Sequence, residues 1–418
     1  MNNRVILHID LNCFYASVEM VLNPALKGRA VAVCGSREDR HGIVLAKSEL
    51  AKAAGVKTGM ITSEAERLCP GLIVVPPNFQ MYHKFSKLAK EIYLRYSDRV
   101  EPYGLDENWV DVTHIARDFQ EAFTLAEEIR TTVSQELGLT VSVGVSFNKI
   151  FAKLASDMKK PDATTVISPD NFRTVAWNAP VGDLLFVGRS SLKTLERFAI
   201  HTIGDLARAD KRMLERHLGK NGGMLWEFAN GLDTSEVKLV GDVPVPKSIG
   251  HGITCNADVT DNEEVARIFL ELSQDIARQL RREKLWADGL QIAVKDKALI
   301  TKQFDGFLPA RTQSARLLAD TAYSLFLSAY KKERPIRALT VRATRLTNDP
   351  NGSQMDLFYD YARLEKETEL ERATDDIVAA YGTGAIFPAA ILLNDKTRSH
   401  MEGMSVLPKP FFHSGGET

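Results

Sequence analysis

Three carboxylates stand where strand-like segments of the sequence end. Asp10 follows a short apolar run at residues 5–9, and Asp106 and Glu107 lie between two strand-like halves of residues 100–113. Carboxylates that converge on one point repel each other unless a cation neutralises them, and their oxygens suit Mg²⁺. Paired Mg²⁺ ions suit in-line phosphoryl transfer. Taken singly, the same residues more often serve as a helix cap, for Asp10, or as part of a polar hairpin turn.

The segments around these carboxylates predict an α/β arrangement. Apolar runs predict further strands at residues 29–35 and 139–146, and helical periodicity predicts helices at 13–22, about 80–97, 119–137 and 148–158. Short helices and glycine turns follow at 169–232, and residues 233–246 are typical of a linker. Residues 247–346 predict the order βαββαβ, which indicates a ferredoxin-like module.

Composition and charge narrow the class of protein. The chain has 418 residues, 44% of them apolar and 26% charged, which excludes a disordered or fibrous protein and predicts two to four domains. Its four cysteines form no C-x-x-C pair, so neither a zinc site nor a disulfide framework is indicated. With no signal peptide and no apolar run of about 20 residues, we expect a soluble protein of the cytoplasm that uses no membrane.

A formal net charge of −1 argues at first against a partner such as nucleic acid. Residues 247–346, however, hold 17 Lys and Arg against 12 Asp and Glu, a charge of +5, so the remainder carries −6. The near-neutral total is therefore an average over a basic C-terminal module and an acidic remainder.

Three runs carry a family resemblance. HIDLNCFYASVE, PYGLDENWVDVT and SVGVSFNKIFAKLASDMKKP occur in this order at residues 8–19, 102–113 and 142–161. Together they resemble the Y-family DNA polymerases, the translesion enzymes, and most closely the bacterial polymerase IV and polymerase V catalytic-subunit branches. The resemblance covers about residues 5–358. It implies a template-directed, low-fidelity DNA polymerase that binds primer-template DNA and deoxynucleoside triphosphates (dNTPs).

The resemblance also implies a multidomain α/β (α+β) fold. We expect a ferredoxin-like catalytic palm at residues 1–32 and 79–168, and small fingers at 33–78. A helical thumb with a helix-hairpin-helix would occupy 169–232, with a linker at 233–246. A βαββαβ little finger that binds DNA would follow at 247–346, and a tail at 347–418.

Carried over to this sequence, the resemblance implies that Asp10, Asp106 and Glu107 are catalytic and hold two Mg²⁺ ions, with the Leu11 main-chain carbonyl as a further ligand. Tyr15 matches the aromatic steric gate that excludes a ribose 2′-hydroxyl. Phe14 beside it is either a core residue or part of the same nucleotide pocket.

Two lysines are expected to bind the nucleotide. Lys160 matches the lysine of the family's D-M-x-K-P run, whereas Lys52 stands where many members have arginine and is also consistent with a surface lysine. A lysine lacks the bidentate fork of arginine, so the triphosphate would be held more loosely. The chain departs from common family residues at six further positions: Asn12, Ala46, Glu49, Gly104, Asn108 and Trp109.

Two segments are expected to contact the DNA backbone. Residues 184–207 resemble a helix-hairpin-helix in which Gly188 supplies the turn and Phe186 stands at the usual first glycine; an ordinary helical bundle is the alternative. In the little finger, basic and polar residues would follow the phosphates, although a charged face is often only solvated: Lys247, Ser248, Arg337, Arg342 and Arg345.

A pentapeptide after the little finger resembles the bacterial sliding-clamp motif, which would bury its last two side chains in a pocket. Its residues are Gln354, Met355, Asp356, Leu357 and Phe358. We therefore expect the sliding clamp to be a partner. We also expect the polymerase to be a monomer. Two other functions remain open: a weakly active or inactive clamp- and DNA-binding accessory protein on the same scaffold, and another palm-type enzyme such as a nucleotide cyclase.

Overall fold

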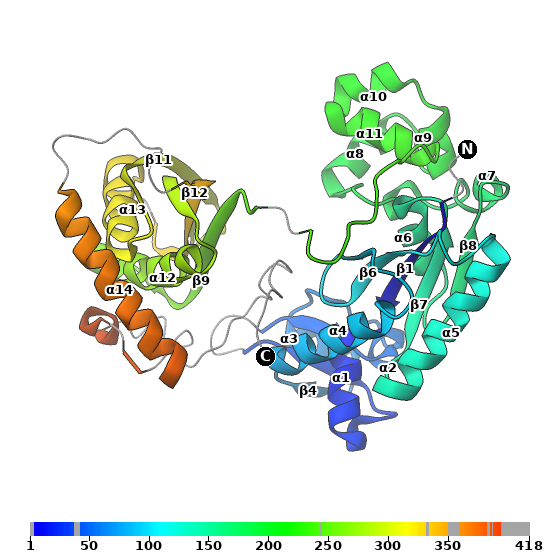
Figure 1. Cartoon of the computed structure of the whole chain (residues 1–418), viewed down its shortest axis with the longest axis horizontal. Coiled ribbons are helices and arrows are strands. Elements are labelled where there is room, and N and C mark those ends of the chain that lie inside the picture. The colour runs from blue at the N-terminus through cyan, green and yellow to red at the C-terminus, as the bar shows by residue number, and fades with distance from the viewer. Residues whose placement is uncertain are drawn as a thin grey trace. The chain divides into compact units, whose positions relative to one another are not determined.

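The computed structural model describes residues 4–36, 42–242, 245–331, 334–349, 360–382, 385–386 and 388–393. They divide into two compact units, one chiefly of residues 4–242 and the other chiefly of residues 245–393 (Figure 1). The division falls inside the segment that the sequence predicts to be a linker. The clamp-like motif at 354–358 lies outside the described residues.

A five-stranded sheet forms the centre of the first unit, in the order β5-β6-β1-β7-β8. Its strands are β1 (Ile6–Leu11), β5 (Val100–Pro102), β6 (Glu107–Asp111), β7 (Val141–Ser146) and β8 (Thr164–Ile167). The β1 strand is antiparallel to both of its neighbours, β6 and β7. All six residues of β1 are buried, because helices cover both faces of the sheet.

Helices lie on both sides of this sheet (Figure 1). Because successive side chains of a strand point to opposite faces, the side chains of β1 are divided between those helices. Leu7, Ile9 and Leu11 pack in the core shared with α1 (Phe14–Leu22), α4 (Phe79–Tyr93) and α5 (Phe119–Leu137). Ile6 packs instead against Ala152 of α6 (Lys149–Met158) on the opposite face. His8 and Asp10 follow Ile6 at intervals of two, so they are directed to the α6 side.

The α6 helix lies close to β7 because Gly144 has no side chain. A Cβ atom at Gly144 would come within 1.9 Å of the Ala152 carbonyl oxygen and 2.5 Å of the Ser156 nitrogen. Gly144 therefore sets the distance between the sheet and the helix that carries Lys153.

Smaller elements complete the first unit. A three-stranded sheet, in the order β3-β2-β4, carries two short helices: β2 (Val31–Cys34), β3 (Val44–Lys47), β4 (Ile73–Val75), α2 (Glu49–Ala53) and α3 (Thr62–Leu68). A 3₁₀ turn, η1 (Pro24–Leu26), precedes β2. The helical region comprises α7 (Phe172–Val175), η2 (Val181–Asp183), α8 (Arg189–Arg197), α9 (Ile203–Arg208), α10 (Lys211–Leu218) and α11 (Lys220–Ala229).

One detail of this region differs from the sequence prediction. Phe186 rather than Gly188 takes the left-handed conformation at the turn, with φ of 71°, whereas Gly188 is extended at φ of −80° and precedes α8. The predicted linker has no helix or strand at residues 233–242, yet Val237 is fully buried and Arg4 donates hydrogen bonds to the carbonyls of Asp233 and Ser235.

The second unit confirms the predicted βαββαβ order. Its elements are β9 (Ser248–Val259), α12 (Asn262–Arg282), β10 (Trp286–Asp296), β11 (Thr301–Thr312), α13 (Ala315–Ala329) and β12 (Ile336–Thr347). The sheet order is β11-β10-β12-β9, and α12 and α13 pack on one face of it. The tail adds α14 (Tyr361–Tyr381) and η3 (Ala389–Leu393).

Ion pairs fix α14 to this unit. Arg281 of α12, whose side chain is almost buried, pairs with Glu371 and lies 2.6 Å from Asp375. Glu371 also accepts a hydrogen bond from the Ala315 nitrogen at the start of α13. Across the described parts of the chain, no helix is both long and apolar enough to span a bilayer.

Gly144→Ala should destabilise the first unit by about 3 kcal/mol or more, because the added methyl group forces α6 away from β7. Gly188→Ala is the matched control, since a Cβ atom there meets nothing within 4 Å, and its effect should stay within about 1 kcal/mol. Urea unfolding of the two variants tests this. Equal unfolding midpoints would show that α6 does not depend on close contact at Gly144.

Candidate active site

The end of β1 and the start of β6 bring the three predicted carboxylates together. Asp10 and Glu107 are directly opposite each other in the antiparallel ladder, and the Leu11 nitrogen donates a 3.0 Å hydrogen bond to the Asp106 carbonyl oxygen. Residues 80 or more apart in sequence thus meet at one sheet edge. The strand pairing explains why a single carboxylate on β1 and an adjacent pair beside β6 belong to one cluster.

Two lysines neutralise part of this negative charge. Lys160 Nζ lies 2.7 Å from Asp10 Oδ2 and 2.8 Å from Asp157 Oδ1. Lys153 Nζ lies 3.0 Å from Asp157 Oδ2, 3.1 Å from Glu107 Oε2 and 3.5 Å from Asp10 Oδ2. The sequence analysis missed Lys153 and Asp157. Lys153 and Asp157 are four residues apart on a helix that ends just before Lys160. This spacing could have been read from the sequence, because it places the three side chains on one side of the helix.

His8 is the other group that the sequence analysis missed. It is fully buried, with Nδ1 2.8 Å from Ser156 Oγ and Nε2 3.2 Å from Glu107 Oε2. Burial lowers the pKa of His8, which keeps the ring neutral. The two ring nitrogens of His8 thus face Glu107 and the Ser156 hydroxyl, and that hydroxyl donates a hydrogen bond to the Lys153 carbonyl oxygen.

The pKa values of Asp106 and Glu107 shift in opposite directions. Burial, together with the charges of Asp10 and Glu107, raises the pKa of Asp106 to about 7. Burial also acts to raise the pKa of Glu107, but His8 and Lys153 outweigh it and the pKa is lowered. Lys153 and Lys160 lie beside Asp10 and Glu107, whereas Asp106 has no lysine paired with it among the described residues.

The chemistry of the donors fits a hard divalent cation. All three side chains offer oxygen, and Glu107 Oε2 is buried without a well-aligned hydrogen bond. Among the described residues, no group of three or more acidic, histidine or cysteine side chains is already gathered tightly enough to hold a metal ion. Lys153 and Lys160 instead supply the positive charge beside Asp10 and Glu107.

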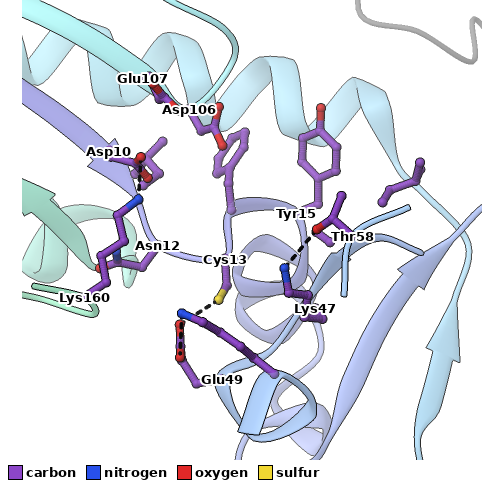
Figure 2. Close-up of a pocket in the computed structure, with 15 residues that line it drawn as sticks. Asp10, Asn12, Cys13, Tyr15, Lys47, Glu49, Thr58, Asp106, Glu107 and Lys160 are labelled. Atoms are coloured by element: carbon purple, nitrogen blue, oxygen red, sulfur yellow. Dashed lines mark hydrogen bonds and ion pairs between the residues drawn. The ribbon is translucent and has the colours of Figure 1, made fainter. Parts of the chain in front are cut away.

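A cavity of about 390 Å³ adjoins the carboxylates. Figure 2 shows Asp10, Asp106 and Glu107 on one side of it and Tyr15, Lys47 and Thr58 on the other. Leu11, Phe14, Ala46, Lys52 and Lys160 also line it. The structure thus brings together every residue that the sequence analysis assigned to the metal and nucleotide sites.

An aromatic cluster fixes the Tyr15 ring at the cavity wall. Tyr82 stacks on it with a centroid distance of 4.2 Å and an interplanar angle of 8°, and Phe79 contacts it edge-on at 5.9 Å. Tyr82 is fully buried and its hydroxyl donates a 2.6 Å hydrogen bond to Glu19. Phe14 is only 3% exposed and belongs mainly to the core beneath.

Two of the residues that depart from the family pattern, Glu49 and Asn12, have polar partners here. Glu49 accepts a hydrogen bond from the Cys13 thiol at 3.0 Å (Figure 2). The Glu49 carboxylate also lies 3.5 Å from Lys52 Nζ. The Asn12 side chain donates to Ser142 and accepts from the Asp162 nitrogen.

Two more departures have a structural reason. Gly104 has φ of 108°, a conformation that L residues rarely adopt. The Trp109 indole nitrogen donates to the Lys149 carbonyl.

The predicted DNA-contact residues lie in several places. In the second unit, Ser248 pairs with Thr344, which brings Lys247 and Ser248 to the end of β12 that carries Arg342 and Arg345. Arg337 lies at the opposite end of β12. Gly188 belongs to the helical region of the first unit.

The pKa of Asp106 predicts a pH dependence of stability in the metal-free protein. The ordinary pKa of an aspartate is about 4, so the folded state holds this proton more tightly than the unfolded chain. The contribution of Asp106 to the free energy of unfolding is therefore complete below about pH 4 and lost as the pH rises to about 7. With EDTA present, wild type should lose more stability over this range than Asp106→Asn. Parallel stability curves would contradict the raised pKa.

Comparisons with known proteins identify the family. The impB/mucB/samB family matches residues 9–157, and its C-terminal domain matches residues 246–357. A DNA polymerase IV of Acetivibrio thermocellus is 46% identical over 394 residues, which cover 94% of this chain and 98% of the relative. DNA polymerase IV 1 of Bacillus subtilis is 36% identical, with 95% of each chain covered.

A solved structure shows the shared fold. A Y-family DNA polymerase chimera aligns with 82% of this chain and 100% of its own length, with a TM-score of 0.74 and 22% identity. The chain therefore belongs to the impB/mucB/samB family, that of the Y-family DNA polymerases, as its three sequence motifs indicated.

Proposed function

We propose that the cavity beside Asp10, Asp106 and Glu107 is where this translesion DNA polymerase joins a dNTP to a primer 3′-hydroxyl. Membership of the family implies primer-template DNA and dNTPs as substrates, and dependence on a divalent metal. The observation that carries the proposal is the pairing of Asp10 with Glu107 at the sheet edge, next to a 390 Å³ cavity walled by Tyr15.

Two Mg²⁺ ions would be held by the side chains of Asp10, Asp106 and Glu107 and the main-chain carbonyl of Leu11. Bound there, they would lower the pKa of the primer hydroxyl and offset the charge of the phosphates. His8 and Lys153 support this role because both contact Glu107 and hold its carboxylate ionised. Lys160 and Lys52, which line the same cavity, would bind the triphosphate.

Tyr15 would serve as the steric gate. Its ring is enclosed by Tyr82 and Phe79, so it cannot turn aside for a larger sugar. Burial and the charge of Asp106 raise the pKa of its hydroxyl to about 12, so the ring stays uncharged at the pH of synthesis. A rigid neutral ring beside the carboxylates suits contact with the unsubstituted 2′-carbon of a deoxyribose.

The domain roles follow the boundaries expected from the sequence. We assign the palm to residues 1–32 and 79–168, the fingers to 33–78, the thumb to 169–232 and the little finger to 247–346. Gly188 in the thumb would contact the DNA backbone, as would Lys247, Ser248, Arg337, Arg342 and Arg345 in the little finger. Residues 354–358 would bind the sliding clamp, and the polymerase would work as a monomer.

Asp106→Ala or Glu107→Ala should reduce primer extension in Mg²⁺ by about 10³-fold, because the metal ions would lose an oxygen ligand. Affinity for primer-template DNA should change less than about twofold. Asp111→Asn, at the other end of β6, is the matched control and should extend primers normally. Normal extension by either alanine variant would overturn the assignment of the carboxylates.

Tyr15→Ala should raise ribonucleotide incorporation, relative to deoxynucleotide incorporation, by about 100-fold because the clash with the 2′-hydroxyl disappears. Tyr15→Phe keeps the ring and should retain discrimination to within about threefold. Single-nucleotide incorporation with matched dNTP and rNTP measures both effects. An unchanged sugar preference in Tyr15→Ala would refute the gate.

A further inference from the structure

The β12 strand has one face toward the helices of the second unit and one face free of them. Leu339, Val341 and Ala343 are fully buried in the core with α12 and α13. Thr340, Arg342 and Thr344 alternate with them and are directed to the other face.

Glycines on the neighbouring strands leave one side of each of these residues without an opposing side chain on that face. Gly252 and Gly250 of β9 lie opposite Thr340 and Arg342, and Gly289 of β10 lies opposite Thr344. A Cβ atom would come within 2.4 Å of a Thr340 atom at Gly252, and within 2.5 Å of a Thr344 atom at Gly289. Glycine inside a strand often marks a place where another backbone approaches closely.

Arg345 and Phe307 meet above one of these glycines. Gly289 is also opposite Phe307 of β11, and a Cβ atom there would lie 3.2 Å from Arg345 Cδ. The Arg345 guanidinium carbon is 3.9 Å from the centroid of the Phe307 ring. Arg345 has φ of 53°, a conformation that is rare for a residue with a side chain and that clusters at functional sites.

This contact holds the arginine without neutralising it. Within the described part of the chain, the Arg345 guanidinium has no ion pair or hydrogen bond. Arg311, by contrast, pairs through two nitrogens with Asp288 at 2.7 and 2.9 Å. Phe307 as a whole residue is 70% exposed, so it contributes little to the core. An aromatic face attracts a cation and restricts its rotation, yet leaves its N–H donors available.

We propose that Phe307 is a positioning residue that holds the Arg345 guanidinium ready for a DNA backbone phosphate. The proposal rests on the proposed function, in which this unit contacts DNA. Arginine binds phosphate through paired N–H donors, and ordering the side chain before binding lowers the entropy cost of the contact.

A double-mutant cycle on the full-length protein tests the proposal. Equilibrium binding of a primer-template duplex is measured at several salt concentrations for wild type, Phe307→Leu, Arg345→Ala and the double variant. Phe307→Leu should weaken binding by about threefold, the usual size of an exposed cation–π contact, with an unchanged salt slope. Arg345→Ala should reduce the salt slope by about one. In the Arg345→Ala background, Phe307→Leu should have no further effect.

Two controls separate positioning from folding and from direct contact. Phe307→Tyr keeps an aromatic face and should bind as wild type does. Leu327→Ala removes another exposed apolar side chain, on α13, and should leave binding unchanged. The proposal is overturned if Phe307→Leu binds normally, or if it weakens binding equally when Arg345 is absent. Salt-independent binding by wild type would instead contradict the proposed DNA contact of the whole unit.

Discussion

Mutual repulsion among Asp10, Asp106 and Glu107 is the constraint around which the first unit is built. The antiparallel pairing of β1 and β6 forces these carboxylates to one edge, where they cannot all stay ionised without nearby positive charge. That charge comes from Lys153 and Lys160, one carried by α6 and the other just beyond its end. The approach of α6 depends in turn on Gly144, so a glycine in the sheet controls the electrostatics of the site.

The residues that follow β1 also shape the cavity beside the carboxylates. Residues after β1 turn through Cys13, with φ of 48°, into α1, which directs Tyr15 toward the carboxylates. The α4 helix then supports Tyr15 with Phe79 and Tyr82. Negative charge and a rigid aromatic wall thus lie within one cavity. In the proposed function this combination suits a nucleotide, because the carboxylates would hold the cations that its phosphates need and the ring would select its sugar by shape.

The second unit carries its charges differently. Arg281 and Arg311 are used within the unit, since Glu371, Asp375 and Asp288 pair with them. Arg345 is held by an aromatic ring instead, which leaves its charge available. Glu371 and Asp375 lie beyond residue 346, so the formal charge of +5 on residues 247–346 overstates the net positive charge of the folded unit. Which arginines remain unpaired depends on the side chains that the fold packs beside them.

The sequence by itself determined the family and the βαββαβ order of the second unit, and it singled out the three carboxylates that meet beside β1 and β6, because these depend on local patterns and contiguous motifs. It also located α5 closely, since that helix has a clear helical period. It did not reveal His8, Lys153 and Asp157, whose roles depend on how α6 packs against β1, nor the contact between Phe307 and Arg345. It placed the turn at Gly188, whereas Phe186 adopts the left-handed conformation. Only the tertiary structure decided these points, because packing between distant segments determines which charges are paired and which residues accept an unfavourable backbone conformation.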